Sequence, residues 1–169
     1  MMMLLIFSAV GIQAQESEQK SSLLDDMNLE IKTLYGLKQH NMNPLNLNIQ
    51  LSYSYTERLS LLLSVERNYM LFSGNDSKWY KDGTSLGGGL AYVWMKDKHQ
   101  NFDVRLQVLN TIGSSQWKHA AYDIGLSWYE KRGKRSPSPF MGIGFRYQKS
   151  HTAGTRDWCG FYATVGVRF

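Results

Sequence analysis

The chain of 169 residues is long enough for one domain, and its content of aromatic residues (13%) and only three prolines favours β-structure over α-helix. A mean hydropathy of −0.38 excludes a bundle of transmembrane helices. The basic residues behind the net charge of +5 are scattered rather than clustered, so we expect no nucleic-acid partner. Cys159 is the only cysteine, which excludes an intramolecular disulfide.

The amino-terminal part divides into two short regions. Residues 1–14 are predicted to be a signal peptide, because residues 4–7 open a short apolar core and Ala14 offers a cleavage point. Residues 15–27 are polar and charged, and we expect them to form a periplasmic lead-in. Residues 28–169 are then predicted to form a single β-domain.

Apolar and polar residues alternate along the β-domain with the period of two that is typical of strands with two different faces. The alternating segments are residues 29–38, 45–56, 59–66, 86–94, 102–108, 122–128, 141–148 and 159–169. We expect a tight turn at residues 56–58 and the longest loop at about residues 72–83. Segments of about seven to twelve residues suit strands that cross a bilayer at a tilt. The sequence therefore predicts an all-β fold, an eight-stranded antiparallel up-and-down transmembrane β-barrel.

The last alternating segment carries a resemblance. Its apolar positions are Cys159, Phe161, Ala163, Val165, Val167 and Phe169. This ending resembles the carboxy-terminal strand of Gram-negative outer-membrane β-barrel proteins. The resemblance implies a location in the cell outer membrane and a partner in the barrel-assembly machinery. In that family such a strand is the signal that the machinery reads, which here corresponds to Phe161, Val165, Val167 and Phe169.

Aromatic residues at the strand ends distinguish a membrane barrel from a soluble one, because a bilayer favours an aromatic belt at each interface. The belt expected at the periplasmic end comprises Tyr53, Tyr55, Tyr92, Trp94, Trp128, Phe140 and Phe169. The belt expected at the outer end comprises Tyr35, Tyr69, Tyr147 and Trp158. A soluble periplasmic barrel that carries a ligand remains an alternative, since the same alternation with the two faces exchanged would describe it.

The face opposite the apolar one carries charges of both signs. They are Glu30, Lys32, Lys38, Glu66, Asp103, Arg105, Asp123, Arg146 and Arg168. Inside a narrow barrel these groups can neutralise one another. An eight-stranded barrel is just wide enough to be filled by its own side chains, so we expect a closed lumen. The glycines at 87–89 and 142–144 leave room for the alternative of a narrow pore for small solutes.

The expected function is structural or a binding role of the loops, without catalysis and without a cofactor or metal, and we expect a monomer. The candidate loop contacts combine cations with aromatic residues: Lys78, Trp79, Tyr80, Trp117, Arg156 and Trp158. Such side chains suit the phosphates and sugars of lipopolysaccharide, other outer-membrane lipids, or a protein partner that the sequence does not identify. An enzyme that modifies lipid A is a further alternative, because His40, His119 and His151 have serines nearby at Ser114, Ser115 and Ser150.

Overall fold

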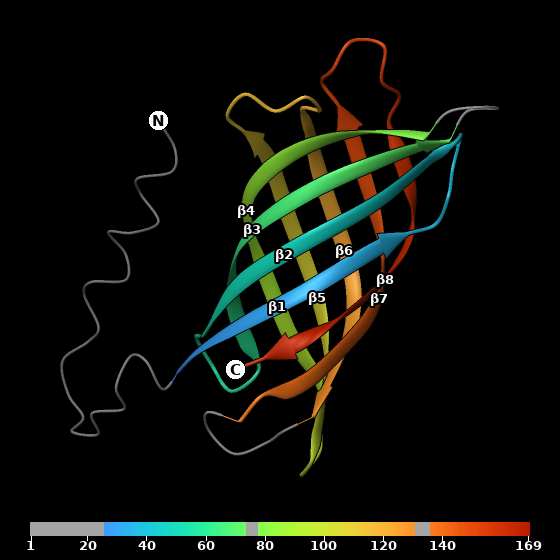
Figure 1. Cartoon of the computed structure of the whole chain (residues 1–169). Helices are drawn as coiled ribbons and strands as arrows, with labels where there is room; N and C mark the ends of the chain where they lie inside the picture. Colours follow the sequence, from blue (N-terminus) through green and yellow to red (C-terminus); the bar gives the residue numbers. More distant parts are fainter. Residues whose placement is uncertain (1–25, 74–77, 131–135) are drawn as a thin grey trace.

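The computed structural model describes residues 26–73, 78–130 and 136–169, without the side chains of residues 78 and 79. These residues form eight strands: β1 (Met27–Gly36), β2 (Met42–Ser54), β3 (Leu59–Ser73), β4 (Lys78–Lys96), β5 (Gln100–Ile112), β6 (His119–Glu130), β7 (Ser138–Ser150) and β8 (Trp158–Arg168). Consecutive strands pair antiparallel, and β8 returns to β1 to close a barrel (Figure 1). The predicted fold class is confirmed. The predicted signal peptide and most of the lead-in lie outside the described residues.

The seam between β1 and β8 is paired along its length. Its register runs from Glu30 opposite Arg168 to Gly36 opposite Tyr162. Beyond this ladder, Leu29 and Phe169 exchange two backbone hydrogen bonds of 2.8 and 3.1 Å. The closed wall therefore has no free edge at the seam, and Phe169 is part of it. No helix in the described part of the chain is long and apolar enough to span a bilayer.

The two faces of the wall have opposite chemistry. On β2, Ile49 is 49% exposed on the outside, whereas the neighbouring Gln50 is 0% exposed inside. The same alternation places large aliphatic and aromatic side chains on the outside of every strand and mostly polar or charged ones within. A ligand-carrying soluble barrel has the reverse arrangement, with an apolar interior. The prediction of a transmembrane barrel with a polar lumen is thus confirmed.

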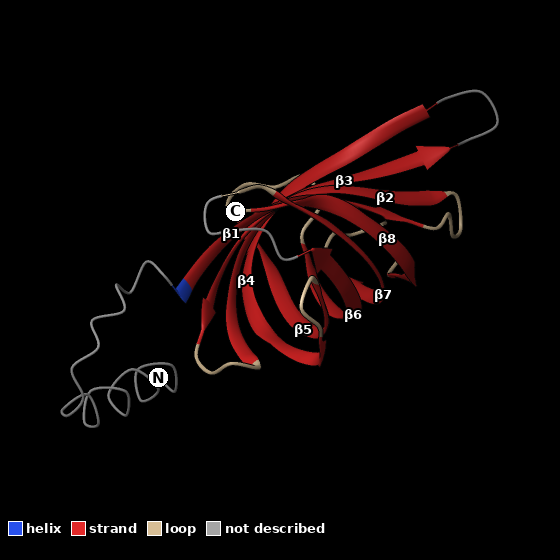
Figure 2. Cartoon of the chain, turned by 90° about the horizontal axis from the view of Figure 1, so that it is seen from below, coloured by secondary structure: helices blue, strands red, loops and turns tan. Residues whose placement is uncertain are grey.

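The barrel has two distinct ends. The terminal end holds the start of β1, the end of β8 and the connections after β2, β4 and β6, whereas the distal end holds the other connections (Figures 1 and 2). Tyr55 and Trp94 are exposed at the terminal end, and Tyr35 is exposed at the distal end, as the two aromatic belts require. Two residues were assigned to the belts wrongly. Phe140 and Trp158 are 2% and 0% exposed, because both occupy inward positions of their strands.

The expected long loop at residues 72–83 is wrong. β3 continues to Ser73 and β4 begins at Lys78, so a paired hairpin replaces most of the loop. β5 pairs with β4 only from Thr84 onward, and this hairpin therefore extends beyond β5 at the distal end (Figure 1). The tight turn after β2 is confirmed. There the backbone N–H groups of Tyr55 and Thr56 both donate to the carbonyl of Leu59.

Because the apolar face contacts lipid, a charged substitution on it should destabilise the barrel, and more so toward the middle of the bilayer. Ile143 lies near the middle of β7 and is 64% exposed on the outer face. We expect Ile143→Arg to lower the free energy of unfolding by roughly 2–4 kcal/mol in lipid vesicles, because the guanidinium would sit in hydrocarbon. Met95→Arg at the terminal end should cost about 0–1 kcal/mol, because it lies at the interface. Urea titration measures both, and equal costs would contradict the assignment.

Candidate functional site in the barrel lumen

The first group of lumen charges is centred on Arg146 of β7 and is called the Arg146 cluster. Its guanidinium donates to Glu66 of β3 through Nη1 and Nη2, at 2.6 and 3.0 Å. It also donates to Asp123 of β6 through Nε and Nη2, at 2.5 and 2.6 Å. Asp123 is the direct neighbour of Arg146 in the β6–β7 ladder, whereas Glu66 comes from the opposite wall. This paired set of charges therefore braces the barrel across its width.

The second group, the Arg105 cluster, repeats this arrangement with other strands. Arg105 of β5 donates to both carboxylate oxygens of Glu30 on β1, at 2.5 and 3.0 Å. Its Nε and Nη2 donate to Asp103, two residues earlier on the same strand, at 2.9 Å each. β1 and β5 lie opposite each other in the strand order, so this cluster is a second brace. Two bidentate contacts fix each guanidinium more firmly than single bonds would.

Two further cations flank Glu30. Lys32 Nζ lies 3.9 Å from its carboxylate and donates to Gln50 at 2.8 Å, while Arg168 Nη1 lies 3.4 Å from it. The structure thus brings together eight of the nine charged residues predicted for the inner face. Four are acidic and four are basic, so their formal charges cancel: Glu30, Glu66, Asp103 and Asp123 against Lys32, Arg105, Arg146 and Arg168. Lys38 was expected inside but is exposed, because β1 ends at Gly36.

Neutral side chains fill the space around the charges. Gln50 accepts hydrogen bonds from Ser64 and Gln107, at 3.2 and 2.5 Å, which links three strands. Aromatic rings lie beside the guanidinium groups. Phe140 is 4.6 Å from Arg105 and Tyr129 is 4.2 Å from Arg168. Phe140, wrongly predicted to face lipid, therefore contributes a cation–π contact inside the lumen.

The glycines that suggested room for a pore do not leave open space. A Cβ atom on Gly144 would lie 2.5 Å from the ring of Tyr162, which therefore occupies that space. A Cβ atom on Gly87 would lie 2.0 Å from the carbonyl oxygen of Val108 on β5, so the neighbouring strand occupies the space there. Both glycines permit close packing of the wall and its contents, as expected where a sheet curves tightly.

An apolar cluster, the distal plug, lies at the distal end of the lumen. It comprises Met42, Met70, Trp117 and Trp158, all at most 3% exposed, with Phe72 packed against them. The Trp158 indole N–H donates to the carbonyl of Leu37 at 3.2 Å, and the ring of Trp117 stacks on His119 with centroids 3.9 Å apart. Trp117 and Trp158 were predicted to be loop contacts, and this is wrong, because both are buried.

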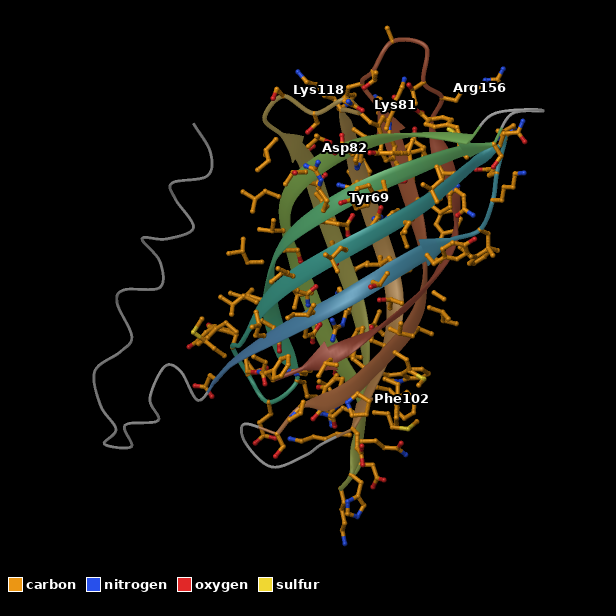
Figure 3. The ribbon with its side chains drawn as sticks, viewed as in Figure 1. Tyr69, Lys81, Asp82, Phe102, Lys118 and Arg156 are labelled. Atoms are coloured by element: carbon orange, nitrogen blue, oxygen red, sulfur yellow. The ribbon has the colours of Figure 1, made fainter. Side chains whose placement is uncertain are left out.

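The distal loops are tied to one another above the plug. Lys81 Nζ donates to the hydroxyl of Thr155 at 2.7 Å, and the backbone N–H of Lys118 donates to the hydroxyl of Thr152 at 2.7 Å. Figure 3 shows Lys81, Lys118 and Arg156 together at this end. Of the predicted loop contacts, Tyr80 and Arg156 are exposed. The side chains of Lys78 and Trp79 are not among those that the structure describes.

The predicted histidines do not form a catalytic arrangement in the described part of the chain. His40 and His151 are exposed. His119 is buried, and its Nδ1 lies 3.1 Å from the hydroxyl of Thr111. That hydroxyl donates to the backbone carbonyl of His119 and accepts from its N–H. Its hydrogen bonds therefore fix the backbone rather than prepare a nucleophile. Within the described residues no group of three or more His, Cys, Asp or Glu side chains could hold a metal ion.

The closed eight-stranded wall, apolar outside and charged inside, has the fold of an outer-membrane β-barrel. No protein-family model and no curated protein matches the chain. The attachment invasion locus protein Ail of Yersinia pestis is similar in structure, with 11% identity, a TM-score of 0.46, and coverage of 85% of this chain and 96% of Ail. The outer membrane enzyme PagL gives 14% identity, a TM-score of 0.42, and coverage of 82% and 96%. Likeness at these values carries no information on function.

The Arg146 cluster predicts that the free energy of unfolding depends strongly on the positive charge of Arg146. Arg146→Met would leave Glu66 and Asp123 buried without a positive partner, and we expect a loss of about 3–5 kcal/mol in the free energy of unfolding. The triple variant with Glu66→Gln and Asp123→Asn removes all three charges and should recover most of that loss. Urea titration in lipid vesicles measures both variants.

The matched control is Lys96→Met, which breaks the exposed ion pair between Lys96 and Glu57. We expect it to change stability by less than about 1 kcal/mol, because water screens exposed charges. A result for Arg146→Met as small as that of the control would contradict the bracing role.

Asp157, in the loop between β7 and β8, has a pKa below its ordinary value of 3.8. The hydroxyl of Tyr147 donates to one of its oxygens at 2.7 Å, and the backbone N–H of Ser150 donates to the other at 2.8 Å. Both bonds favour the carboxylate. The resulting stabilisation is present above the unfolded-state pKa and is lost as the pH falls through the folded-state pKa.

We expect Tyr147→Phe to raise the pKa of Asp157 toward its ordinary value, because the larger of the two causes is removed. The carbon-13 chemical shift of the Asp157 carboxyl, followed against pH, measures this change. Tyr122→Phe is the control, since no hydrogen bond joins Tyr122 to Asp157, and it should leave the titration unchanged. An identical curve for wild type and Tyr147→Phe would show that the hydroxyl has no such effect.

Proposed function

We propose that this chain is an integral outer-membrane barrel that is closed to solutes, is not an enzyme, and has a structural or loop-mediated binding role. The observation that carries the proposal is the filled lumen. Both bidentate clusters span opposite walls, and the distal plug lies at one end of the same interior. A barrel of this size needs few side chains to be filled.

Passage of an ion would require these contacts to open. Arg105 and Arg146 are 5% and 1% exposed, and each holds two carboxylates. Separating such a pair inside the barrel would leave charges with neither partner nor water, which costs several kcal/mol for each ion. This cost argues against the narrow pore that the glycines suggested.

The terminal end is proposed to face the periplasm and the distal end the exterior. An even number of strands puts the start of β1 and the end of β8 at the same end, and the predicted signal peptide would deliver the chain from the periplasmic side. Phe161 and Val165 lie exposed on the outer face of β8, where assembly factors could reach them. Recognition by the barrel-assembly machinery, and a monomeric state, belong to the same proposal.

The exposed distal end is proposed to contact outer-membrane lipids. Lys38, Lys118, Lys149 and Arg156 are exposed there, with Tyr80 on the protruding hairpin. These four cations would attract the phosphates of lipopolysaccharide, because each cation near an anionic surface adds to the attraction. A protein that binds the same loops is not identified by these residues.

Single-channel recording in planar bilayers tests the closed lumen. We expect the wild-type protein to show no discrete conductance steps, because the lumen contacts would have to separate to admit ions. A bilayer with an open porin is the positive control for insertion and detection. Reproducible steps from the purified protein would overturn the closed state.

Mass spectrometry of lipid A from cells with and without the protein tests the absence of catalysis. We expect the same acylation and phosphorylation profile in both. Among the described residues, no histidine both contacts a nucleophilic side chain and is oriented by a carboxylate, as a catalytic triad requires. Thr111→Val is the matched variant, since it removes the hydroxyl next to His119. A profile that changes with wild type and reverts with Thr111→Val would show that the protein is an enzyme.

A further inference from the structure

We propose that the outer face of the barrel at the distal ends of β6 and β7 binds one molecule of lipid A. In this site the lysines Lys118 and Lys149 would hold a phosphate, Tyr122 and Tyr147 would contact a sugar ring, and an acyl chain would lie in the groove below them. The inference rests on the proposed placement in the outer membrane but not on the closed lumen.

The phosphate part of the site is a pair of exposed ammonium groups. Lys149 lies opposite Ala120 in the β6–β7 ladder, and Lys118 is two residues before Ala120. His151 donates its backbone N–H to the carbonyl of Lys118, which holds the two chain segments together at 2.7 Å. Neither lysine forms an ion pair within the described residues. Both charges are therefore available to an anion.

One neighbouring acid, Asp157, does not cancel the charge of this pair. Asp157 is close enough for Lys149 to help lower its pKa, so it offsets part of the positive charge. Its two oxygens, however, already accept hydrogen bonds from Tyr147 and Ser150. The cluster of Lys118, Lys149 and Asp157 keeps a net positive charge.

The aromatic part lies directly below the lysines on the same face. Tyr122 and Tyr147 are opposite each other in the ladder, with ring centroids 6.3 Å apart and planes inclined by 20°. Tyr122 is 47% exposed, and the hydroxyl of Tyr147 is fixed by Asp157. Two nearly parallel rings at the bilayer interface offer an apolar surface with polar edges, which suits the ring of a sugar.

The apolar part is a groove of about 530 Å³ that continues downward from the two tyrosines over β4 to β7. Its lining is almost entirely apolar and includes Leu90, Leu106, Val108, Ile124 and Phe145. Gly88 explains the hollow, because it takes the outward position between the exposed leucines Leu86 and Leu90 and has no side chain. An acyl chain would fill the groove without burying a polar group.

The order of these parts selects the ligand. From the distal end toward the middle of the wall, the face presents cations, then aromatic rings, then an apolar groove. Lipid A presents phosphate, sugar and acyl chain in the same order. An ordinary phospholipid has a phosphate and acyl chains but no sugar ring between them. The tyrosine pair is therefore the feature that favours lipid A.

Native mass spectrometry of the full-length protein, folded in detergent and titrated with purified lipid A, tests the site. We expect the double variant Lys118→Gln/Lys149→Gln to bind lipid A about thirtyfold more weakly than wild type, since two cations are lost. Lys96→Gln/Lys98→Gln makes the same change at the terminal end and should bind like wild type. Tyr122→Leu keeps an apolar side chain but removes the ring, and should weaken lipid A binding without weakening that of phosphatidylglycerol.

Three results would overturn the site: equal binding by the two double variants, equal affinity for lipid A and phosphatidylglycerol, or equal affinity for lipid A without its phosphates. The outcome is separable from the proposed function. A chain that conducts ions but binds lipid A through Lys118 and Lys149 would refute only the closed lumen. A closed chain that fails to bind lipid A would refute this inference and the proposed lipopolysaccharide contact of the same lysines, and would leave the closed lumen standing.

Discussion

Hydrocarbon offers no hydrogen-bond partner to a peptide group, so a sheet that crosses a bilayer must pair every strand with a neighbour on both sides. In this chain the requirement is met by returning β8 to β1, where Leu29 and Phe169 complete the seam with two backbone bonds. In a closed barrel, successive side chains of a strand point alternately into the lumen and out of the wall. Once the outside is apolar, the polar half of every strand must be accommodated within the barrel.

That accommodation shapes what the protein can do. Charges inside a narrow barrel must find partners, and Arg105 and Arg146 each hold two carboxylates, one of them from the opposite wall. The same contacts that satisfy the charges join strands that share no ladder, so they brace the barrel across its width. The proposed function therefore assigns binding to the exposed surface. The groups proposed to contact lipids lie on the distal loops, which are tied together by bonds such as that from Lys81 to Thr155, and on the outer face of β6 and β7.

The sequence allowed the strands, their faces and the identity of the lumen charges to be predicted, because all three follow from a period of two. The same period also places Phe140 and Trp158 inside, because each directly precedes an outward residue, Met141 or Cys159. Trp117 could not be placed in this way, because it lies in a loop that has no period. The pairing of Arg146 with Glu66 could not be predicted either, since it depends on how the strands are staggered around the barrel.

The central claim is that aliphatic side chains on the outside touch lipid while those in the lumen do not. Nuclear Overhauser effects between methyl groups and lipid acyl chains in nanodiscs measure this directly, with matched aliphatic residues on the two faces. We predict cross-peaks to acyl protons from Ile143 and Val165, and none from Leu62 and Leu109, which are 6% and 0% exposed inside the barrel. Cross-peaks from the two lumen leucines with none from Ile143 and Val165 would contradict the account.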